Sequence, residues 1–160
     1  MGLPTRSPPG TAKNPPMRRL AGVLALAVVS CASPDDPKAL RNLGDECVGC
    51  HTPGKKAGPW PFTAAGTVYR VASDDPVPGL AAVRITLTDG AGKVVRLTSN
   101  RAGNFWTKEP LAFPVAVELQ REGSERKAAV RSGPCSSGAC NACHTWPARN
   151  GARGRLHAPL

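Results

Sequence analysis

Apolar and polar residues alternate along the middle of this 160-residue chain. Val83, Ile85 and Leu87 take every second position of the stretch 82–88, with Arg84, Thr86 and Thr88 between them. A period of two is typical of a strand with one buried face. The Asp-Gly-Ala-Gly stretch at 89–92 predicts a hairpin turn, and residues 94–98 predict the returning strand.

The same pattern recurs on both sides of this hairpin. We expect further strands at 66–71, 104–107 and 126–130, and one along the alternating residues Phe113, Val115, Val117 and Leu119. Short strands separated by turns favour a mainly β fold, a small antiparallel sandwich over residues 63–131. Irregular or short-helical segments are expected to flank it.

Composition and charge narrow the class of protein. The chain has 17 Gly and 17 Pro, which would interrupt the long helices of a bundle, and its length excludes a large multidomain enzyme. The formal net charge is +10, but part of it lies in the first thirty residues, which contain no acid: Arg6, Lys13, Arg18 and Arg19. The remaining excess is too small to indicate a nucleic-acid partner.

The N-terminal region reads as an export signal. Arg18 and Arg19 precede an apolar run at 20–29, which is too short to span a bilayer but suits a secretory signal over residues 1–30. The stretch ending at Ser30 and Cys31 resembles a bacterial lipobox, which implies cleavage before Cys31 and lipid attachment to it.

The lipobox resemblance also implies a location. A lipid on Cys31 would anchor the mature chain to a membrane, and Ala32 after it favours the outer membrane within a periplasmic or cell-surface location. Residues 31–46 are then expected to be a tether. The alternative is an ordinary signal peptide with Cys31 as a plain thiol. Met17 is a second candidate for the start of translation.

Two copies of a C-x-x-C-H motif carry the candidate chemistry. They are Cys47-Val48-Gly49-Cys50-His51 and Cys140-Asn141-Ala142-Cys143-His144. This is the attachment motif of c-type haem: two thiols add to the vinyl groups of one porphyrin, and the following histidine ligates the iron. The sequence therefore predicts two covalently bound haem c groups, in segments 47–62 and 132–160, with His51 and His144 as axial ligands.

Other chemistries of paired cysteines remain open. A thioredoxin-type pair belongs in a βαβ context, which the pattern does not show, and the spacing between the pairs is long for a zinc ribbon. Structural disulfides suit an exported protein. None of these explains a histidine after each pair. Cys135 is left over, as a free thiol, an intermolecular bridge or an unusual haem ligand.

The number of methionines and histidines in the sequence limits which residues can occupy the sixth coordination position of each haem iron. Met1 and Met17 are the only methionines and both precede Cys31, so a mature chain cannot supply a methionine ligand. His157 is the only remaining histidine and a candidate distal ligand. At most one haem is then bis-histidine from this chain alone. The other iron would be five-coordinate, bind water or use a rarer ligand such as Lys55, Lys56, Tyr69 or Cys135.

The central stretch resembles the carboxypeptidase regulatory-like domain, a transthyretin-like sandwich. The matching residues are Gly66-Thr67-Val68, Val77-Pro78-Gly79-Leu80-Ala81-Ala82-Val83, Ile85-Thr86-Leu87-Thr88-Asp89 and Thr98-Ser99-Asn100-Arg101-Ala102-Gly103-Asn104-Phe105. Members are mostly non-catalytic folding or interaction modules, so the resemblance implies no reaction here.

The whole mature chain is similar to exported bacterial haem proteins in which such motifs bracket a sandwich. This similarity implies a lipid-anchored two-haem c-type cytochrome that carries single electrons between redox partner proteins and is not an enzyme. One alternative is a haem protein whose open iron site binds peroxide or a gas. Another is a haem-free interaction lipoprotein stapled by disulfides. The sequence does not give the oligomeric state, the partners or the potentials.

Overall fold

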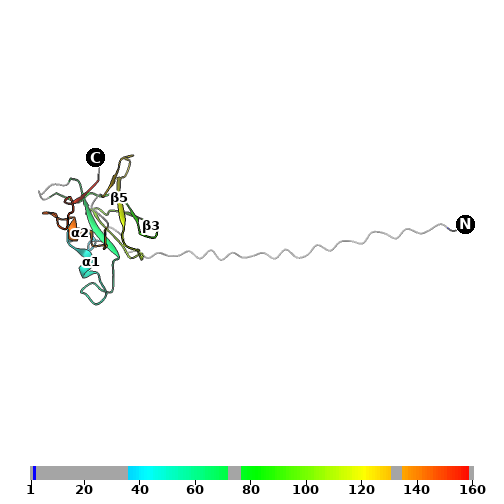
Figure 1. The fold of residues 1–160 in the computed structure, drawn as a ribbon, viewed down its shortest axis with the longest axis horizontal. Coiled ribbons are helices and arrows are strands. Elements are labelled where there is room, and N and C mark those ends of the chain that lie inside the picture. The colour runs from blue at the N-terminus through cyan, green and yellow to red at the C-terminus, as the bar shows by residue number, and fades with distance from the viewer. Residues whose placement is uncertain (1, 3–35, 72–76, 131–134, 159–160) are drawn as a thin grey trace. The chain divides into compact units, whose positions relative to one another are not determined.

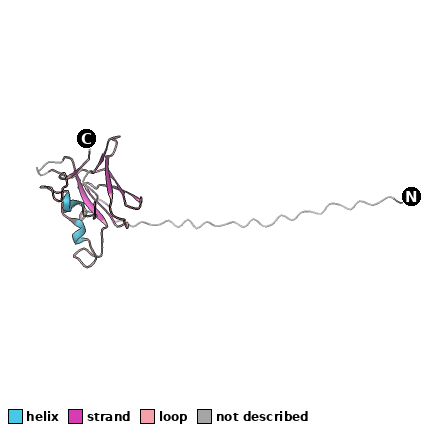
Figure 2. Ribbon diagram, viewed as in Figure 1, coloured by secondary structure: helices cyan, strands magenta, loops and turns pink. Residues whose placement is uncertain are grey.

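The computed structural model describes residue 2 and residues 36–71, 77–130 and 135–158 (Figures 1 and 2). The export signal, Cys31 and the start of the expected tether lie outside the described residues. Within them the fold is mainly β, which confirms the predicted class. The elements are α1 (Cys47–Cys50), β1 (Ala64–Tyr69), β2 (Val83–Thr88), β3 (Val94–Thr98), β4 (Asn104–Thr107), β5 (Ala116–Arg121), β6 (Lys127–Ala129), α2 (Cys140–Cys143) and β7 (Leu156–His157).

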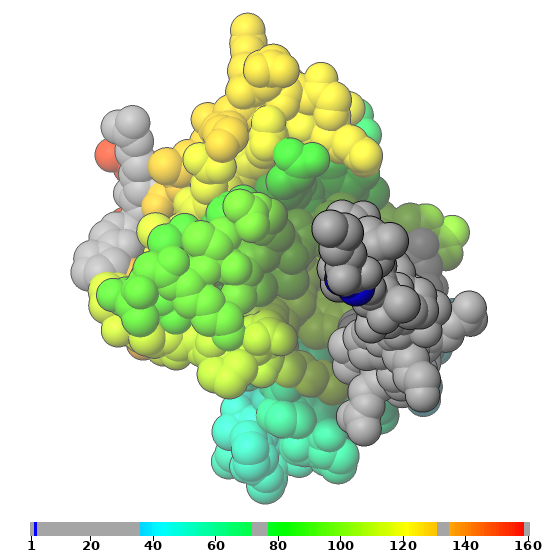
Figure 3. Space-filling view, turned by 90° about the vertical axis from the view of Figure 1, so that its right-hand side faces the viewer, coloured from blue at the N-terminus to red at the C-terminus, as the bar shows by residue number. Residues whose placement is uncertain are grey.

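Two sheets form the sandwich. One is an antiparallel sheet in the order β3-β2-β5-β6, and the other is a mixed sheet in the order β4-β1-β7. In the first sheet Ile85 lies opposite Leu119, and Leu87 lies opposite Val117. The space-filling view shows the green and yellow segments, which hold the β2–β3 and β5–β6 strands, above the cyan segment that contains α1 (Figure 3).

The core lies where the alternating pattern placed it. Val83, Ile85 and Leu87 are fully or almost fully buried, and Phe105 of β4 packs with them in one apolar cluster. Their neighbours Arg84, Thr86 and Thr88 are exposed or half-buried. Burial of alternate side chains therefore fixes the register, since a one-residue slip would turn the arginine and threonines inward.

The strand boundaries differ in several places from the sequence-based prediction, most clearly in β1 and β5. The strand expected at 66–71 begins at Ala64 and ends at Tyr69, because Ala64 already pairs with Thr107 of β4. Phe113 is 38% exposed and precedes β5, so the alternating run begins one apolar residue later than expected. Val115 is buried and forms an isolated bridge with Cys135.

The predicted hairpin joins β2 to β3. Asp89 accepts main-chain hydrogen bonds from Ala91 (3.0 Å), Lys93 (2.8 Å) and Ala112 (2.9 Å). These bonds, that from Ala112 first, lower the pKa of the Asp89 carboxyl. Gly92 has φ +84°, a conformation that glycine adopts without a steric penalty.

The segment before the first motif is packed on the sandwich. The side-chain amides of Asn100 and Asn104 donate to the carbonyl of Ala39 (2.8 and 3.1 Å), and Asn104 also donates to the carbonyl of Arg41 (3.0 Å). Residues 36–46 belong to the stretch 31–46 expected as a tether. The hydrogen bonds hold this described part against the fold.

The C-terminal segment adds a strand that the pattern did not predict. β7 runs parallel to β1, with Leu156 opposite Val68 and His157 opposite Tyr69. Leu156 is 3% exposed and belongs to the core cluster. The sandwich thus includes part of the segment 132–160. No helix in the described part of the chain is long and apolar enough to cross a membrane.

Candidate functional site

The two C-x-x-C-H motifs adopt the same local conformation. Each spans one helical turn that the following histidine ends: the His51 amide donates to the Cys47 carbonyl (2.9 Å), and the His144 amide donates to the Cys140 carbonyl (2.8 Å). Residues three and four apart lie on one face of a helix. Each turn therefore places its two cysteines and the following histidine three and four residues apart, the spacing of one helix face.

The first histidine is held by the connector that follows it. Nδ1 of His51 is 2.7 Å from the carbonyl oxygen of Trp60. The Phe62 ring stacks on the imidazole, with the centroids 3.9 Å apart and the planes inclined by 7°. The Trp60 ring itself is 58% exposed, with the Lys108 ammonium 4.4 Å from its centroid. The Trp60 main chain and the Phe62 ring thus orient His51.

The second histidine is held by the C-terminal segment. Nδ1 of His144 is 2.9 Å from the carbonyl oxygen of Gly154, and the residue is 8% exposed. Gly154 precedes β7, which is paired with β1. The rigid sheet therefore positions the carbonyl that orients the imidazole.

The hydrogen bond at Nδ1 has the same effect on the tautomer of both histidines. A carbonyl oxygen only accepts hydrogen bonds, so a neutral imidazole bonded to it carries its proton on Nδ1. The lone pair is then on Nε2. This tautomer is the one that ligates a metal through Nε2, and an outer carbonyl acceptor of this kind is the usual partner of a metal-bound histidine.

The thiols of the two motifs differ in exposure. Cys47, Cys50, Cys135, Cys140 and Cys143 are free thiols. Burial, followed by the charge of Cys135, raises the pKa of Cys140 to about 12. Burial and the neighbouring acids Glu46 and Asp45 raise the pKa of Cys47 to about 11. Cys50 is exposed, whereas Cys140 packs against the apolar core.

A buried polar cluster joins the two motifs. The Asn141 side chain, in the second motif, donates to the carbonyl of Asp45 (2.9 Å), two residues before the first motif. It also donates to Oγ1 of Thr67 (3.1 Å) and accepts a bond from the Thr67 amide (3.0 Å). Thr67 lies on β1 and is 0% exposed, and Asn141 is 4% exposed. α1 and α2 accordingly lie side by side (Figure 1).

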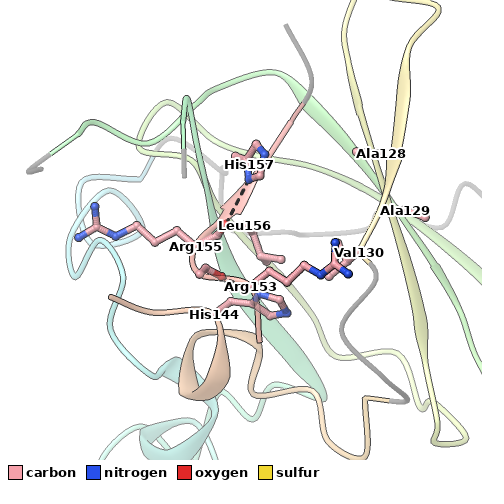
Figure 4. A pocket seen from close by; sticks show the side chains of 9 residues that line it. Ala128, Ala129, Val130, His144, Arg153, Arg155, Leu156 and His157 are labelled. Atoms are coloured by element: carbon pink, nitrogen blue, oxygen red, sulfur yellow. Dashed lines mark hydrogen bonds between the residues drawn. The ribbon is translucent and has the colours of Figure 1, made fainter. Parts of the chain in front are cut away.

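A cavity of about 220 Å³ lies beside His144, and His157 also lines it (Figure 4). Arg153 extends along this cavity toward Val130, whereas the Arg155 side chain points away from it. Both histidines line this cavity, but the exposed His157 imidazole points away from His144, with Leu156 between them (Figure 4). Nδ1 of His157 is 3.4 Å from the carbonyl oxygen of Arg155.

The other candidate ligands lie elsewhere. The thiol of Cys135 is half-buried and near Cys143, which contributes to its raised pKa after burial. Tyr69 is 4% exposed, with the Arg155 guanidinium carbon 4.8 Å from the centroid of its ring. Lys55 and Lys56 are exposed on the connector. Among the described residues, no group of three or more His, Cys, Asp or Glu side chains is placed to hold one metal ion.

The residues present fit haem attachment at both motifs. Each motif offers two thiols for the two vinyl groups and an imidazole whose Nε2 is the ligating nitrogen. The cavity beside His144 is smaller than the ~300–1,000 Å³ typical of enclosed ligand sites, so a bound macrocycle would extend beyond it. Cys140 is partly buried against the apolar core, so its thiol is less accessible than that of the exposed Cys50.

Three residues of the site carry no signal in the sequence. Trp60 and Gly154 act through main-chain carbonyls, which every residue possesses. Asn141 occupies a variable position of the motif, and only its burial and its partners reveal its role.

No protein-family model, curated protein or solved structure matches this chain.

Proposed function

We propose that this chain is an exported, lipid-anchored c-type cytochrome that holds two covalent haem groups and carries single electrons between redox partner proteins. The observation that carries the proposal is the paired orientation of His51 and His144. Each follows a C-x-x-C turn, and each directs Nδ1 to a main-chain carbonyl. A disulfide staple or a free thiol pair requires no oriented histidine, so this shared arrangement favours haem over those alternatives.

The residues have separate roles in the proposal. Cys47 and Cys50 hold one haem, Cys140 and Cys143 hold the other, and His51 and His144 are the axial ligands. Haem supplies a reversible one-electron change at its iron. The carbonyls of Trp60 and Gly154 keep each imidazole in the ligating tautomer, and Phe62 restricts the rotation of His51.

His157 is proposed as the distal ligand of the haem at the second motif. It lines the same cavity as His144, and it lies on β7, a strand held by its pairing with β1. The first motif has no comparable histidine in this chain, because all three are then used. The first iron is therefore the candidate for an open or water-bound sixth position.

The export and lipid anchor rest on the apolar run, Ser30 and Cys31. Haem c is attached outside the cytoplasmic membrane, so export and the two motifs support one another. The central sandwich, with its resemblance to the carboxypeptidase regulatory-like domain, is proposed as the non-catalytic frame that positions the two motifs.

The test is expression of the full chain in a host with haem-attachment machinery. The expected intact mass is that of a chain beginning at acylated Cys31 with two haem groups, and the reduced pyridine spectrum should give two haem per chain. A chain without covalent haem and with oxidised cysteine pairs would contradict the proposal and support a stapled interaction protein.

Carbon monoxide tests whether His157 occupies the sixth position of the iron at the second motif. For a carrier we expect little binding at the haem that His144 and His157 ligate. Binding at that haem that is as strong as at an exposed five-coordinate iron would contradict the role of His157. The variant His157→Ala should then increase the bound carbon monoxide by about one per chain, while His51 and His144 stay unchanged.

A further inference from the structure

The side chain of Asn141, in the second motif, bonds to the segment that leads directly into the first motif. Its amide group bonds to the Asp45 carbonyl ahead of α1 and to both the hydroxyl and the amide of Thr67 on β1. An amide side chain offers donors and an acceptor, and both kinds of group are used here. The two motifs lie far apart in the sequence. The fold brings the second motif next to the segment that precedes the first, and the buried Asn141 side chain makes the contact.

The rest of the cluster leaves Asn141 little freedom. Oγ1 of Thr67 donates to Oδ1 of Asn104 (2.8 Å) and accepts from the Gly44 amide (3.1 Å) as well as from Asn141. Asn104 in turn holds the carbonyls of Ala39 and Arg41. A satisfied buried network of this kind is rigid, because any movement leaves a buried polar group without a partner.

We propose that Asn141 is a positioning residue that holds the two motifs as one site, so that the two haem groups influence each other's reduction. The inference rests on the function proposed above. The charge of one reduced site acts on the other, and such a coupling is reciprocal: each reduction makes the other less favourable by the same amount.

The first test compares the two-haem protein with two single-haem variants. Cys47→Ser/Cys50→Ser keeps only the second haem, and Cys140→Ser/Cys143→Ser keeps only the first. We expect the intact protein to titrate in two waves that lie further apart than the midpoints of the single-haem variants. Paramagnetic resonance of the oxidised two-haem protein should show dipolar broadening that both variants lack. Two waves at the single-haem midpoints, without broadening, would overturn the inference.

The second test asks whether Asn141 is responsible. Asn141→Ala and the milder Asn141→Ser should retain two haem by mass, while the separation of the two waves falls toward the single-haem difference. Asn150→Gly is the matched control, because it adds no charge, glycine tolerates the φ of +51° at this position, and Asn150 donates to Cys143 Sγ (3.4 Å) but has no described contact with the first motif. An unchanged separation in both Asn141 variants would overturn the positioning role.

A third measurement does not need haem. In the haem-free chain, amide hydrogen exchange at Thr67 should be about tenfold faster in Asn141→Ser than in the parent, because that amide loses its acceptor. Exchange at Asn141→Ser that matches the parent would contradict the positioning role even if no haem is attached. A haem-free product with fast exchange would instead contradict the proposed function alone and leave the link between the motifs intact.

Discussion

The two C-x-x-C-H turns have the same backbone and opposite surroundings. The first lies at the surface: Cys50 is exposed, no residue of α1 is buried, and the connector 52–62 holds His51 from outside the sandwich. The second is built into the fold: Asn141 and His144 are buried, and Cys140 packs against the core. The same C-x-x-C-H pattern therefore lies on the surface in the first motif and packs against the core in the second.

The motif determines which thiols and which imidazole are present. The structure around the motif determines at which stage of folding those thiols are accessible for haem attachment. Cys50 of α1 is exposed in the folded chain, whereas Cys47 and Cys140 are both partly buried. Cys140 packs beside β1, where Gly66 gives its side chain room: a Cβ on Gly66 would lie 2.9 Å from Cys140 Cβ and 2.8 Å from Phe105 Cζ. We therefore expect the second haem to be attached before the sandwich closes.

The largest expected effect is on that order of attachment. When the refolded haem-free chain is incubated with haem and a mild reductant, intact mass should show one haem, on the first motif. The same incubation in denaturant, followed by refolding, should give two. Cys47→Ser/Cys50→Ser should take up none in the folded state. Equal haem uptake at both motifs of the folded chain would contradict the expected difference in the accessibility of their thiols.

Replacing the histidine of each motif should lower the unfolding free energy of the chain by different amounts. In the haem-free chain, His144→Ala leaves the buried Gly154 carbonyl without its donor and opens space beside β7, which should cost about 2–3 kcal/mol of unfolding free energy. His51→Ala should cost about 1 kcal/mol, because its surroundings are accessible to water. Urea unfolding measures both, and equal losses would contradict the comparison.

The thiols should differ in their response to pH. Only the thiolate reacts with iodoacetamide, and the pKa values of about 11 for Cys47 and about 12 for Cys140 leave little thiolate at either residue near pH 9. We expect the exposed Cys50 to be alkylated before Cys47 and Cys140, as followed by peptide mass. Alkylation of Cys140 before Cys50 would contradict the packing of Cys140 against the core.

The same pKa values predict alkaline sensitivity. The folded chain keeps the proton of Cys140 above the ordinary pKa of a thiol, 9.0, at which the unfolded chain loses it. Stability is therefore fully present below about pH 9 and falls as the pH rises toward about 12. Cys140→Ala should flatten this fall, whereas Cys50→Ala, at an exposed position, should not.

The smallest expected effect concerns the helix starts. Glu46 Oε2 accepts a bond from the Gly49 amide (2.7 Å) at the start of α1, whereas Ala139 provides no side-chain bond at the start of α2. Glu46→Ala should cost about 0.5–1 kcal/mol, as loss of a helix cap does. Thermal unfolding of the haem-free chain measures it, with Glu125→Ala as a control at an exposed residue.

Sequence patterns predicted the parts of this fold that depend on neighbours along the chain. The β2–β3 hairpin follows from alternation and from the turn at Asp89, and the single-turn helices follow from the motifs themselves. The patterns missed β7, because two residues carry too short a signal and its partner β1 is far away in the chain. They placed residues 36–46 in a tether, because the asparagines that hold Ala39 and Arg41 lie far along the chain, just before and at the start of β4.

The sequence by itself determined which atoms the candidate site contains: two thiols and one histidine in each motif, one further histidine, and no methionine after Cys31. It also determined the face of each long strand that is buried. Only the tertiary structure decided that Asn141 bonds to the segment before the first motif, that His157 lines a cavity with His144, and that Cys140 packs against the core. The physical reason is that composition and spacing constrain local geometry, whereas burial and long-range hydrogen bonds arise only once the two sheets have packed.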